Sequence, residues 1–322
     1  MTISGVIATY NRRERLDECL GALRRQRWAH GDQLVVVDNG STDGTPALIA
    51  RHARDFPAPL LHLQEPRPGK SRALTTALPL ATGDVLAFTD DDVLVDPDWL
   101  DGIRAVMADP GTSLAGGPVA PRWERLASRW LGAAADGGSR LTAPLALLDY
   151  GPAPSDLGAR TLLGANLAIR RDVFTHVGGF PDHLGKRRGT LLSGEDHDLC
   201  RRVQAAGFRA VYSPAIRVRH WVPAERMRLR YCLNWFYWSG ITNAVLDEDE
   251  PLRPGRRIAG VPLYLVKRAA LAACGAAASA IAGRRRAAID HAIDVAYAAG
   301  YISRCRRRRS SRAAAEPARA QP

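Results

Sequence analysis

Cysteine is scarce in this chain of 322 residues, and no two cysteines form a CxxC pair. The five are widely spaced: Cys19, Cys200, Cys232, Cys274 and Cys305. An odd number at such spacings argues against both a disulfide framework and a zinc site. We therefore interpret them as reduced thiols and expect a cytoplasmic protein.

A long uninterrupted apolar run is also missing. The N-terminus, MTISGVIATYNRRERL, passes straight into a strand-like run without the charged and then apolar pattern of a signal peptide. The most apolar stretch, from Ile258 to Gly283, is interrupted by Lys267 and Arg268, and the part after them is mostly alanine. Because a bilayer span needs about 20 predominantly apolar residues, we expect no transmembrane helix.

The third absence is a glycine-rich phosphate loop. The first strand-like run leads into TYNRRE, which matches neither G-x-G-x-x-G nor G-x-x-x-x-G-K-[ST]. The sequence therefore disfavours a dinucleotide-binding or P-loop protein. A nucleotidyltransferase, which would need a basic glycine-rich loop at this point, is a weaker alternative for the same reason.

Positive charge is plentiful but unevenly spread. The formal net charge is +12, and 46% of the residues are of hydrophobic type, enough for a sizeable core. Nine arginines and two aspartates lie between Arg284 and Arg312, so seven of the twelve net charges are near the C-terminus. We expect an anionic partner for this segment rather than for the whole surface, and no nucleic acid.

Strand-like and helix-like segments alternate over the first hundred residues. Apolar, β-branched runs predict strands, and leucines at helical spacing, such as Leu16, Leu20 and Leu23, predict helices between them. The predicted strands are 4–10, 33–41, 60–66 and 84–92, and the predicted helices are 12–26, 43–53 and 70–81. This order predicts an α/β protein with parallel strands. Ligands of such sheets bind at the carboxyl ends of the strands, where the chain has ATYNR, VDNGSTDGT and TDDD.

The remaining chain is less regular at first and then helical. A helix is predicted from near Gly194 to Gly207. From Met227 the pattern is mostly helical. After Ser303 the chain consists mainly of Arg, Ala, Ser and Pro, and we expect residues 304–322 to form a basic, disordered tail.

Three consecutive carboxylates, Asp90, Asp91 and Asp92, end the fourth predicted strand. If the strand continues through them, Asp90 and Asp92 share a face and Asp91 points away. Two adjacent carboxylates repel each other unless a positive group joins them, and a hard divalent cation such as Mg²⁺ would do so together with substrate phosphates. An aspartate-rich turn or helix cap is the alternative.

The order of motifs resembles that of family 2 glycosyltransferases of the GT-A fold, over roughly Ile3 to Arg230. The matching pieces are VIATYNR, VVVDNGSTDGT, PGKSRA, GDVLAFTDDDVLVDPDWL, GANLAIRRDVFTHVGGF and GEDHDLCRRVQAAGFRAVYSP. The resemblance implies a Rossmann-like, mostly parallel sheet flanked by helices, with a helical C-terminal extension. We expect a catalytic domain over 1–225, with a nucleotide-sugar half at about 1–115 and an acceptor half at about 116–225, followed by the extension over 226–303.

The resemblance also implies a donor site. Asp92 would hold a divalent cation, Mg²⁺ or Mn²⁺, while Asp90 would face the ribose or share the ion; in a shifted register Asp91 would be the ligand. Asp38 matches the position that accepts a hydrogen bond from uracil. The other matching donor positions are Thr9, Tyr10, Arg12, Lys70, Arg72, Gly164, Ala165 and Asn166.

The stretch SGEDHDL supplies the expected catalytic carboxylates. Acidic residues in the first turn of a helix also stabilise its dipole, so Glu195, Asp196 and Asp198 could simply be capping residues. The resemblance implies that Asp196 is the general base and that Glu195 holds the acceptor or orients the site. His220, in RVRHW, would reach the ion or the diphosphate, with a structural histidine as the alternative.

The C-terminal segments and their aromatic residues leave two interpretations open. Trp221, Trp235, Phe236, Tyr237 and Trp238 could stack on an acceptor sugar, or could be core or membrane-edge residues. The interleaved arginines and apolar residues could lie on an anionic membrane surface, or the helices could pack as a pair on the catalytic domain.

The predicted function is therefore an inverting, metal-dependent transfer of a sugar from a nucleoside diphosphate sugar, with UDP favoured, to a hydroxyl acceptor. The acceptor would be a saccharide, a lipid-linked compound or a small natural product, as in bacterial glycan or natural product biosynthesis. The alternatives are a nucleotidyltransferase and a non-catalytic binder of anionic membranes or nucleic acid. If the helices bind membrane, the enzyme would be peripheral at its inner face.

Overall fold

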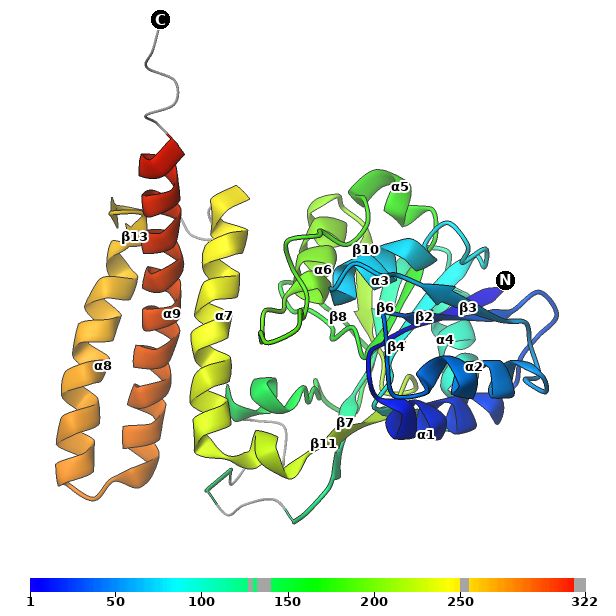
Figure 1. The fold of residues 1–322 in the computed structure, drawn as a ribbon, viewed down its shortest axis with the longest axis horizontal. Coiled ribbons are helices and arrows are strands. Elements are labelled where there is room, and N and C mark those ends of the chain that lie inside the picture. The colour runs from blue at the N-terminus through cyan, green and yellow to red at the C-terminus, as the bar shows by residue number, and fades with distance from the viewer. Residues whose placement is uncertain (127–129, 132–139, 250–254, 316–322) are drawn as a thin grey trace, which may run out of the picture. The chain divides into compact units, whose positions relative to one another are not determined.

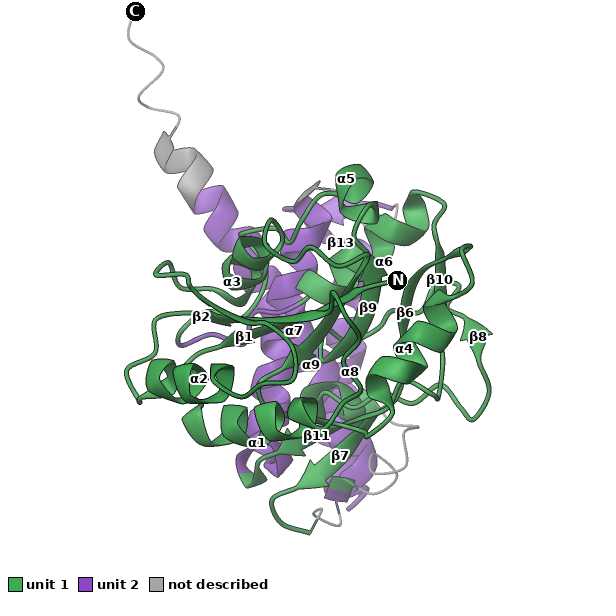
Figure 2. Ribbon diagram, turned by 90° about the vertical axis from the view of Figure 1, so that its right-hand side faces the viewer, with its two compact units in different colours: residues 1–127, 131–188, 194–224 green, residues 128–130, 189–193, 225–322 purple. Residues whose placement is uncertain are grey.

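The computed structural model describes residues 1–126, 130–131, 140–249 and 255–315. The chain forms two compact units, the first comprising 1–127, 131–188 and 194–224 and the second 128–130, 189–193 and 225–322 (Figure 2). The first unit holds the central sheet, and the second is helical (Figure 1).

The first half of the sheet has the predicted alternation of strands and helices. Its strands lie side by side in the order β3-β2-β1-β4, and every neighbouring pair is parallel. The elements are β1 (Ile3–Thr9), α1 (Arg13–Arg24), β2 (Gln33–Asp38), α2 (Thr45–Ala53), β3 (Leu60–Gln64), α3 (Lys70–Ala77) and β4 (Val85–Asp90). The carboxyl ends of β1, β2 and β4 therefore meet at one edge, as predicted.

The second half of the sheet mixes strand directions. β9 lies between β4 and β6 and is antiparallel to both, while β10 is parallel to β6 and antiparallel to β8. These elements are β6 (Thr112–Gly116), β8 (Ser155–Asp156), β9 (Asn166–Arg170) and β10 (Arg209–Tyr212). The expected α/β class with a mostly parallel sheet is confirmed.

Apolar side chains cover both faces of the sheet. One face packs against α1, α2 and α4 (Trp99–Met107) through residues such as Leu20, Ile49 and Ile103. The other packs against α3, α5 (Val173–Val177) and α6 (Glu195–Ala205), with Leu74 and Leu199 in the contact. Figure 1 shows these two helical layers above and below the strands. The two layers fix the edge at which the polar ends of the strands emerge.

A second, smaller sheet lies beside the acidic triplet in sequence and in space. Its order is β5-β11-β7, from β5 (Val93–Val95), β11 (Val218–Val222) and β7 (Val119–Trp123). β5 follows the triplet directly, and its antiparallel pairing with β11 aligns Val93 with His220. The N–H of Trp221 also donates to the carbonyl of Asp92, 2.9 Å away.

Helices dominate the second unit. They are the 3-10 turn η3 (Ala224–Met227), α7 (Leu229–Asp249), α8 (Leu263–Ile281) and α9 (Arg285–Ala315), with the short strands β12 (Arg257–Ile258) and β13 (Val261–Pro262). α7 and α9 approach closely because glycine lies at the contact: a Cβ on Gly240 would collide with the carbonyl of Tyr297, and one on Gly300 with that of Tyr237.

The expectation of disorder after Ser303 was wrong for the described part of that segment. α9 continues without a break to Ala315, and residues 316–322 lie outside the described residues. Arginine and alanine are both strong helix formers, and Arg304 binds both carboxylate oxygens of Glu248 at 2.9 and 3.1 Å. The amino-acid composition suggested a disordered tail because it does not show that Arg304 has a partner, Glu248, on α7.

α8 is the one helix among the described residues that is long and apolar enough to cross a membrane, judged by length and composition only. Its 19 residues include Lys267 and Arg268. Because core helices of water-soluble proteins also meet this criterion, it is weak support for a membrane span.

Candidate active site

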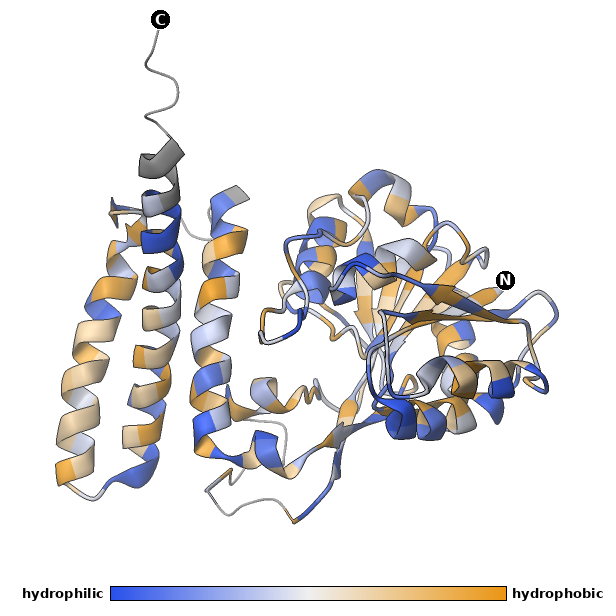
Figure 3. Cartoon of the chain, in the orientation of Figure 1, coloured by the Kyte–Doolittle hydropathy of each residue, from blue (hydrophilic) through white to orange (hydrophobic). Residues whose placement is uncertain are grey.

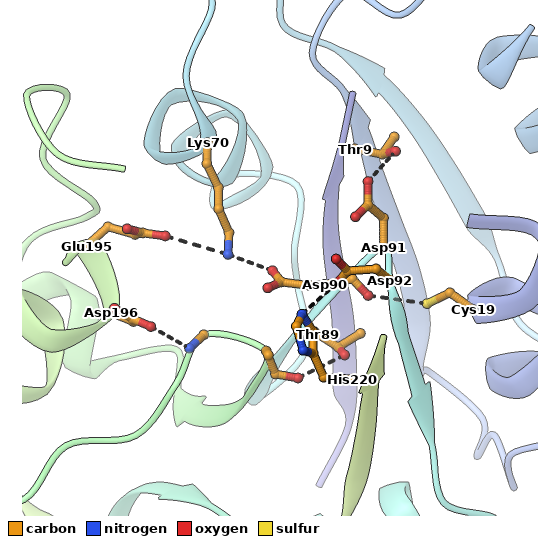
Figure 4. Close-up of polar contacts among 12 residues, drawn as sticks. Thr9, Cys19, Lys70, Thr89, Asp90, Asp91, Asp92, Glu195, Asp196 and His220 are labelled. Carbon is orange, nitrogen blue, oxygen red and sulfur yellow. Dashed lines mark hydrogen bonds and ion pairs between the residues drawn. The ribbon is translucent and has the colours of Figure 1, made fainter. Parts of the chain in front are cut away.

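The strand ends bring together polar side chains that are distant in sequence. Thr9 ends β1, Asp38 ends β2 and Asp90 ends β4, while α3 and α6 begin with Lys70 and Glu195. Figure 4 shows Lys70 pointing between Glu195 and Asp90. This edge therefore contains most of the residues that the sequence singled out.

Arg12, rather than the alternation of a strand, organises the triplet. Its Nη1 donates to Asp91 at 2.9 Å and to Asp92 at 2.5 Å, and the hydroxyl of Thr9 donates to Asp91 at 2.8 Å. Asp90 instead accepts a 2.6 Å hydrogen bond from Lys70. The expected common face of Asp90 and Asp92 is thus not found, because β4 ends at Asp90 and the next two residues form a turn.

Burial and neighbouring charges shift the pKa values of Asp91 and Arg12. Burial, together with the neighbouring Asp92 carboxylate, raises the pKa of Asp91 to about 6, although Arg12 opposes the change. The same carboxylates raise the pKa of Arg12 above its ordinary value, with Asp91 the largest cause. The site is therefore an acidic pair that needs a cation beside it, and Arg12 supplies one.

Asp92 also lies beside His220. The imidazole Nε2 is 3.5 Å from Asp92 Oδ1, and the two residues are only 2% and 8% exposed, respectively. No group of three His, Cys, Asp or Glu side chains in the described ranges could hold an ion alone. Mg²⁺ typically uses only one or two carboxylates and completes its shell with water and substrate phosphates. The Asp92 carboxylate beside an imidazole is a donor set that fits Mn²⁺ on those terms, and the carboxylate alone would serve Mg²⁺.

Lys70 connects the triplet to the expected catalytic helix. Its ammonium lies 2.6 Å from Asp90 and 3.5 Å from Glu195. Burial opposes the charge on Lys70, but the two carboxylates outweigh it and raise the pKa of Lys70. Burial raises the pKa of Glu195 despite Lys70, and the buried Glu195 Oε2 has no hydrogen-bond partner among the residues that the structure describes. Glu195 therefore lies close to the positive charge of Lys70, while the hydrogen-bonding capacity of its carboxylate is only partly used.

Asp196 points toward the loop at Gly164. The Gly164 N–H donates to Asp196 Oδ2 at 2.8 Å, while Oδ1 faces the His197 backbone N–H at 2.8 Å and its Nδ1 at 3.0 Å. The helix can begin here because Gly194 adopts a φ of 104°, a conformation that favours glycine. Burial alone would raise the pKa of Asp196, but His197 and the Gly164 N–H outweigh it and lower the pKa.

A small cavity of about 10 Å³ lies between these groups. Its lining includes Lys70, Asp90, Gly164, Glu195 and Asp196. The space suffices for about one water molecule, so Lys70 or its surroundings must move before a sugar can enter.

A larger cavity of about 660 Å³ is lined by Asp84, Arg104 and Arg170 at the opposite, amino end of β1 and β4. There Arg170 donates to the backbone carbonyls of Thr112 and Met107, so we regard its role as structural.

Sequence comparison gives the family of this site. Residues 4–177 match the model of glycosyl transferase family 2. The chain belongs to this family. It is therefore a glycosyltransferase of the GT-A fold that uses sugar-nucleotide donors, and the nucleotidyltransferase and non-catalytic alternatives are excluded.

Curated relatives and a solved structure agree with this assignment. The chain is 25% identical to glucosyl-dolichyl phosphate glucuronosyltransferase of Haloferax volcanii, over 77% of this chain and 78% of the relative. It is 30% identical to the succinoglycan biosynthesis protein ExoM of Rhizobium meliloti, over 74% and 73%. The mannosyltransferase PcManGT of Pyrobaculum calidifontis, solved with GDP-Man and Mn²⁺, superposes with a TM-score of 0.60 at 22% identity, over 93% of this chain and 86% of that one.

Three predicted donor residues of this glycosyltransferase have other partners. Asn166 is 1% exposed, and its amide binds the Pro118 and Ile216 carbonyls and the Trp99 indole N–H. Arg72 faces the carboxylate of Asp182 at 3.3 Å. Asp38 is buried and accepts the Ser41 N–H at 2.9 Å. Asn166 is therefore placed in the core and not in the cavity.

Tyr10 and the aromatic candidates differ in their surroundings. Tyr10 is 36% exposed, and the Arg188 guanidinium lies 4.4 Å from its ring centre. The guanidinium groups of Arg15 and Arg122 lie 3.9 and 4.9 Å from the ring centre of Trp221. The predicted cluster Trp235, Phe236, Tyr237 and Trp238 lies on α7, where Phe236 is buried. Among these aromatic residues, Tyr10 is the one that lies at the end of a strand of the central sheet.

Three residues of the site were missed from sequence. Asn39 links the loop after β2 to the loop between β3 and α3, donating to the Glu65 and Arg67 carbonyls and accepting the Gly69 N–H. Arg188 covers Tyr10, and His197 pairs with Asp196. Asn39 stands next to Asp38 in the quoted VVVDNGS motif, which was the available signal. No sequence signal pointed to His197, because adjacent residues in a helix rarely face each other. None pointed to Arg188 either, because its loop is far from Tyr10 in the sequence.

Proposed function

We propose that this glycosyltransferase inverts the anomeric centre of its donor, with Asp196 as the general base and a divalent cation at Asp92. The observation that carries the proposal is the cavity itself. Asp196 and Glu195 lie on one side of it and Asp90 and Lys70 on the other. An acceptor activated at α6 would thus face a donor held at the strand ends.

The strand ends supply the groups that a nucleoside diphosphate sugar needs. Tyr10 offers an aromatic face to the base, and Asp38 lies at the position expected to accept from uracil. Lys70 offers a positive charge to the diphosphate, and so does Arg12. UDP is the proposed nucleotide on the strength of Asp38. Binding would require Lys70 to exchange a carboxylate for phosphate oxygens.

Asp92 and His220 are the residues that would hold the cation, with Asp90 or Asp91 as neighbours. A bound divalent cation offsets the charge on the departing diphosphate. The Mn²⁺ in the PcManGT structure supports a cation for this fold. Arg12 already balances Asp91 and Asp92 in the structure, so a bound cation would have to share these carboxylates with Arg12 or displace it from Asp92.

Asp196 would take the proton from the acceptor hydroxyl while that oxygen attacks the sugar. Its side chain is fixed by Gly164 and His197, and Glu195 beside it would orient the acceptor. A single attack opposite the leaving group inverts the anomeric centre. The names of the relatives, which mention dolichyl phosphate and succinoglycan, favour a glycan or lipid-linked acceptor over a small natural product.

A panel of nucleotide sugars tests the donor directly by thermal unfolding with Mn²⁺ present. A ligand that binds only the folded state at 100 times its Kd stabilises it by about 2.7 kcal/mol, which is several degrees in Tm. We expect UDP-sugars to raise the Tm most and the shift to shrink without Mn²⁺. A larger shift with GDP- or dTDP-sugars would overturn the UDP assignment, and no shift with any member would overturn the donor site.

His197 provides a pH test of the base. Asp196 must be deprotonated to act, so activity falls as the pH drops through its pKa. His197 lowers that pKa, and the fall in kcat/KM should therefore begin at a higher pH in His197→Ala than in the wild type. His176→Ala on α5, an exposed histidine that touches neither carboxylate, should leave the profile unchanged. An acid limb at the same or a lower pH in His197→Ala would contradict this role for Asp196.

A further inference from the structure

Large apolar side chains gather on one exposed region of the second unit. Ten such side chains are exposed in the described part of the chain, and five of them lie between Ile258 and Ile281. Leu271 is 74% exposed and Ile281 is 89% exposed. A soluble surface tolerates single exposed apolar residues, but a contiguous group indicates an interaction site.

Three of these five side chains, Tyr264, Leu271 and Ile281, follow the period of α8. Residues 264, 267, 271, 274, 278 and 281 recur every three or four positions, so they share one face of the helix. We name this face the α8 stripe; it consists of Tyr264, Lys267, Leu271, Cys274, Ala278 and Ile281. The opposite face holds Leu265 and Ala272, both buried, and Leu265 packs with residues of α9. The stripe therefore faces away from the partner helix. Figure 3 shows how apolar α8 is along its length.

The sequence that contains the stripe carries positive charge only. From residue 255 to residue 289 the sequence contains seven Lys and Arg residues and no Asp or Glu. Arg284, Arg285 and Arg286 come soon after the end of α8 at Ile281 and are exposed. An apolar helical face bordered by basic residues matches an anionic lipid surface.

We propose that the α8 stripe binds an anionic membrane surface, with α8 lying in the plane of the interface. A span is disfavoured because the neighbouring face of α9 carries Asp294, which pairs with Arg268 at 3.0 Å, and charges are costly inside a bilayer. A second copy is disfavoured because two such surfaces would bring like charges together. This proposal goes beyond the transferase chemistry and does not depend on it.

The proposal also narrows the expected anionic partner site, which the charge count assigned to the whole segment from Arg284 to Arg312. Arg304 and Arg308 lie 2.9 and 3.9 Å from Glu248, so part of that charge is balanced within the unit. α8 supplies the apolar side chains of the stripe together with Lys267, and Arg284, Arg285 and Arg286 lie exposed just beyond its end. The α8 stripe and Arg284–Arg286 should therefore contribute more to membrane affinity than residues 306–309 do.

Vesicle sedimentation of the full chain tests the proposal without any donor or acceptor. The wild type should bind vesicles of phosphatidylcholine mixed with phosphatidylglycerol, and bind pure phosphatidylcholine far less. Replacing Arg284–Arg286 by glutamine should weaken binding by about 100-fold, from the usual worth of basic residues at such surfaces. The double variant Leu271→Ser and Ile281→Ser should weaken it by at least tenfold. Both sites are on the surface, so these variants should fold.

Leu80→Ser is the matched control, because Leu80 is an exposed leucine of the first unit, and it should bind vesicles as the wild type does. Failure of the wild type to bind, or equal binding by all variants, would overturn the proposal. So would a concentration-dependent dimer in sedimentation velocity that the Leu271→Ser and Ile281→Ser variant abolishes while vesicle binding stays intact. That last result would assign the stripe to a second copy of the chain.

Discussion

Asp92→Asn should lose donor and Mn²⁺ binding together while remaining folded. Asp92 is the carboxylate beside His220, at 3.5 Å, and Arg12 would still have Asp91 as a partner at 2.9 Å. Removing even an outer partner of a metal ligand typically costs 10–100-fold in affinity. Loss of a direct ligand should therefore lower Mn²⁺ affinity by at least about 100-fold. Chelation of the wild type with EDTA should abolish transfer in the same way, and Mn²⁺ or Mg²⁺ should restore it.

Titration calorimetry with Mn²⁺ and then with the nucleotide sugar makes this measurement. Asp98→Asn is the matched control, since Asp98 is an exposed carboxylate six residues further along the chain, and it should bind both ligands normally. Asp91→Asn separates the two neighbours, because Asp91 is held by Thr9 and Arg12. A larger loss of Mn²⁺ affinity in Asp91→Asn than in Asp92→Asn would move the ligand to Asp91, and full activity in chelator would refute the metal site.

Local sequence patterns were sufficient for the scaffold of this site. Hydrophobic period and turn chemistry predicted β1, β2, β3 and β4 with the helices between them, and parallel βαβ units have a strong rule for where ligands bind. Thr9 and Asp90 consequently lie at the predicted edge. The GT-A class followed from the order of the motifs, and family membership and the solved structure confirm it.

Contacts between remote segments were not predictable in the same way. The sequence predicted that the fourth strand continues through Asp92, which would place Asp90 and Asp92 on one face. The strand ends at Asp90, so the three carboxylates are grouped differently from the prediction. Asn166 was placed under the donor because of its motif, but its amide holds Pro118, Ile216 and Trp99. Those partners come from elements distant in sequence, and no local pattern reports them.

Asp196→Asn should lower turnover by about two to four orders of magnitude, the usual worth of a positioned base, while donor affinity changes little. Asparagine keeps the size of the side chain and can still accept one of the hydrogen bonds from Gly164 and His197. It cannot take a proton from the acceptor. An interaction made only in the transition state lowers kcat and kcat/KM equally, so both constants should fall together.

Asp198→Asn is the control within the same helical turn. Asp198 Oδ2 accepts from Arg202 Nε at 2.8 Å, and it is not part of the cavity lining. Its replacement removes one acidic residue from the N-terminal turn, at a stability cost of about 0.3–1 kcal/mol, and should leave turnover within a few-fold of the wild type. Activity and donor affinity of the two variants, measured side by side, separate a catalytic role from a capping role.

The pair Asp196→Asn and Asp92→Asn should fail in different ways, since the two carboxylates serve different substrates. Asp92 is joined to Arg12 and His220 at the donor end, and Asp196 is joined to Gly164 and His197 at the other. If Asp196→Asn loses donor binding as severely as Asp92→Asn, then Asp196 belongs to the donor site. Because Asp198 is paired with Arg202, the base would then be Glu195, whose pKa is raised by burial. Glu195→Gln should in that case show the loss of turnover with donor affinity retained.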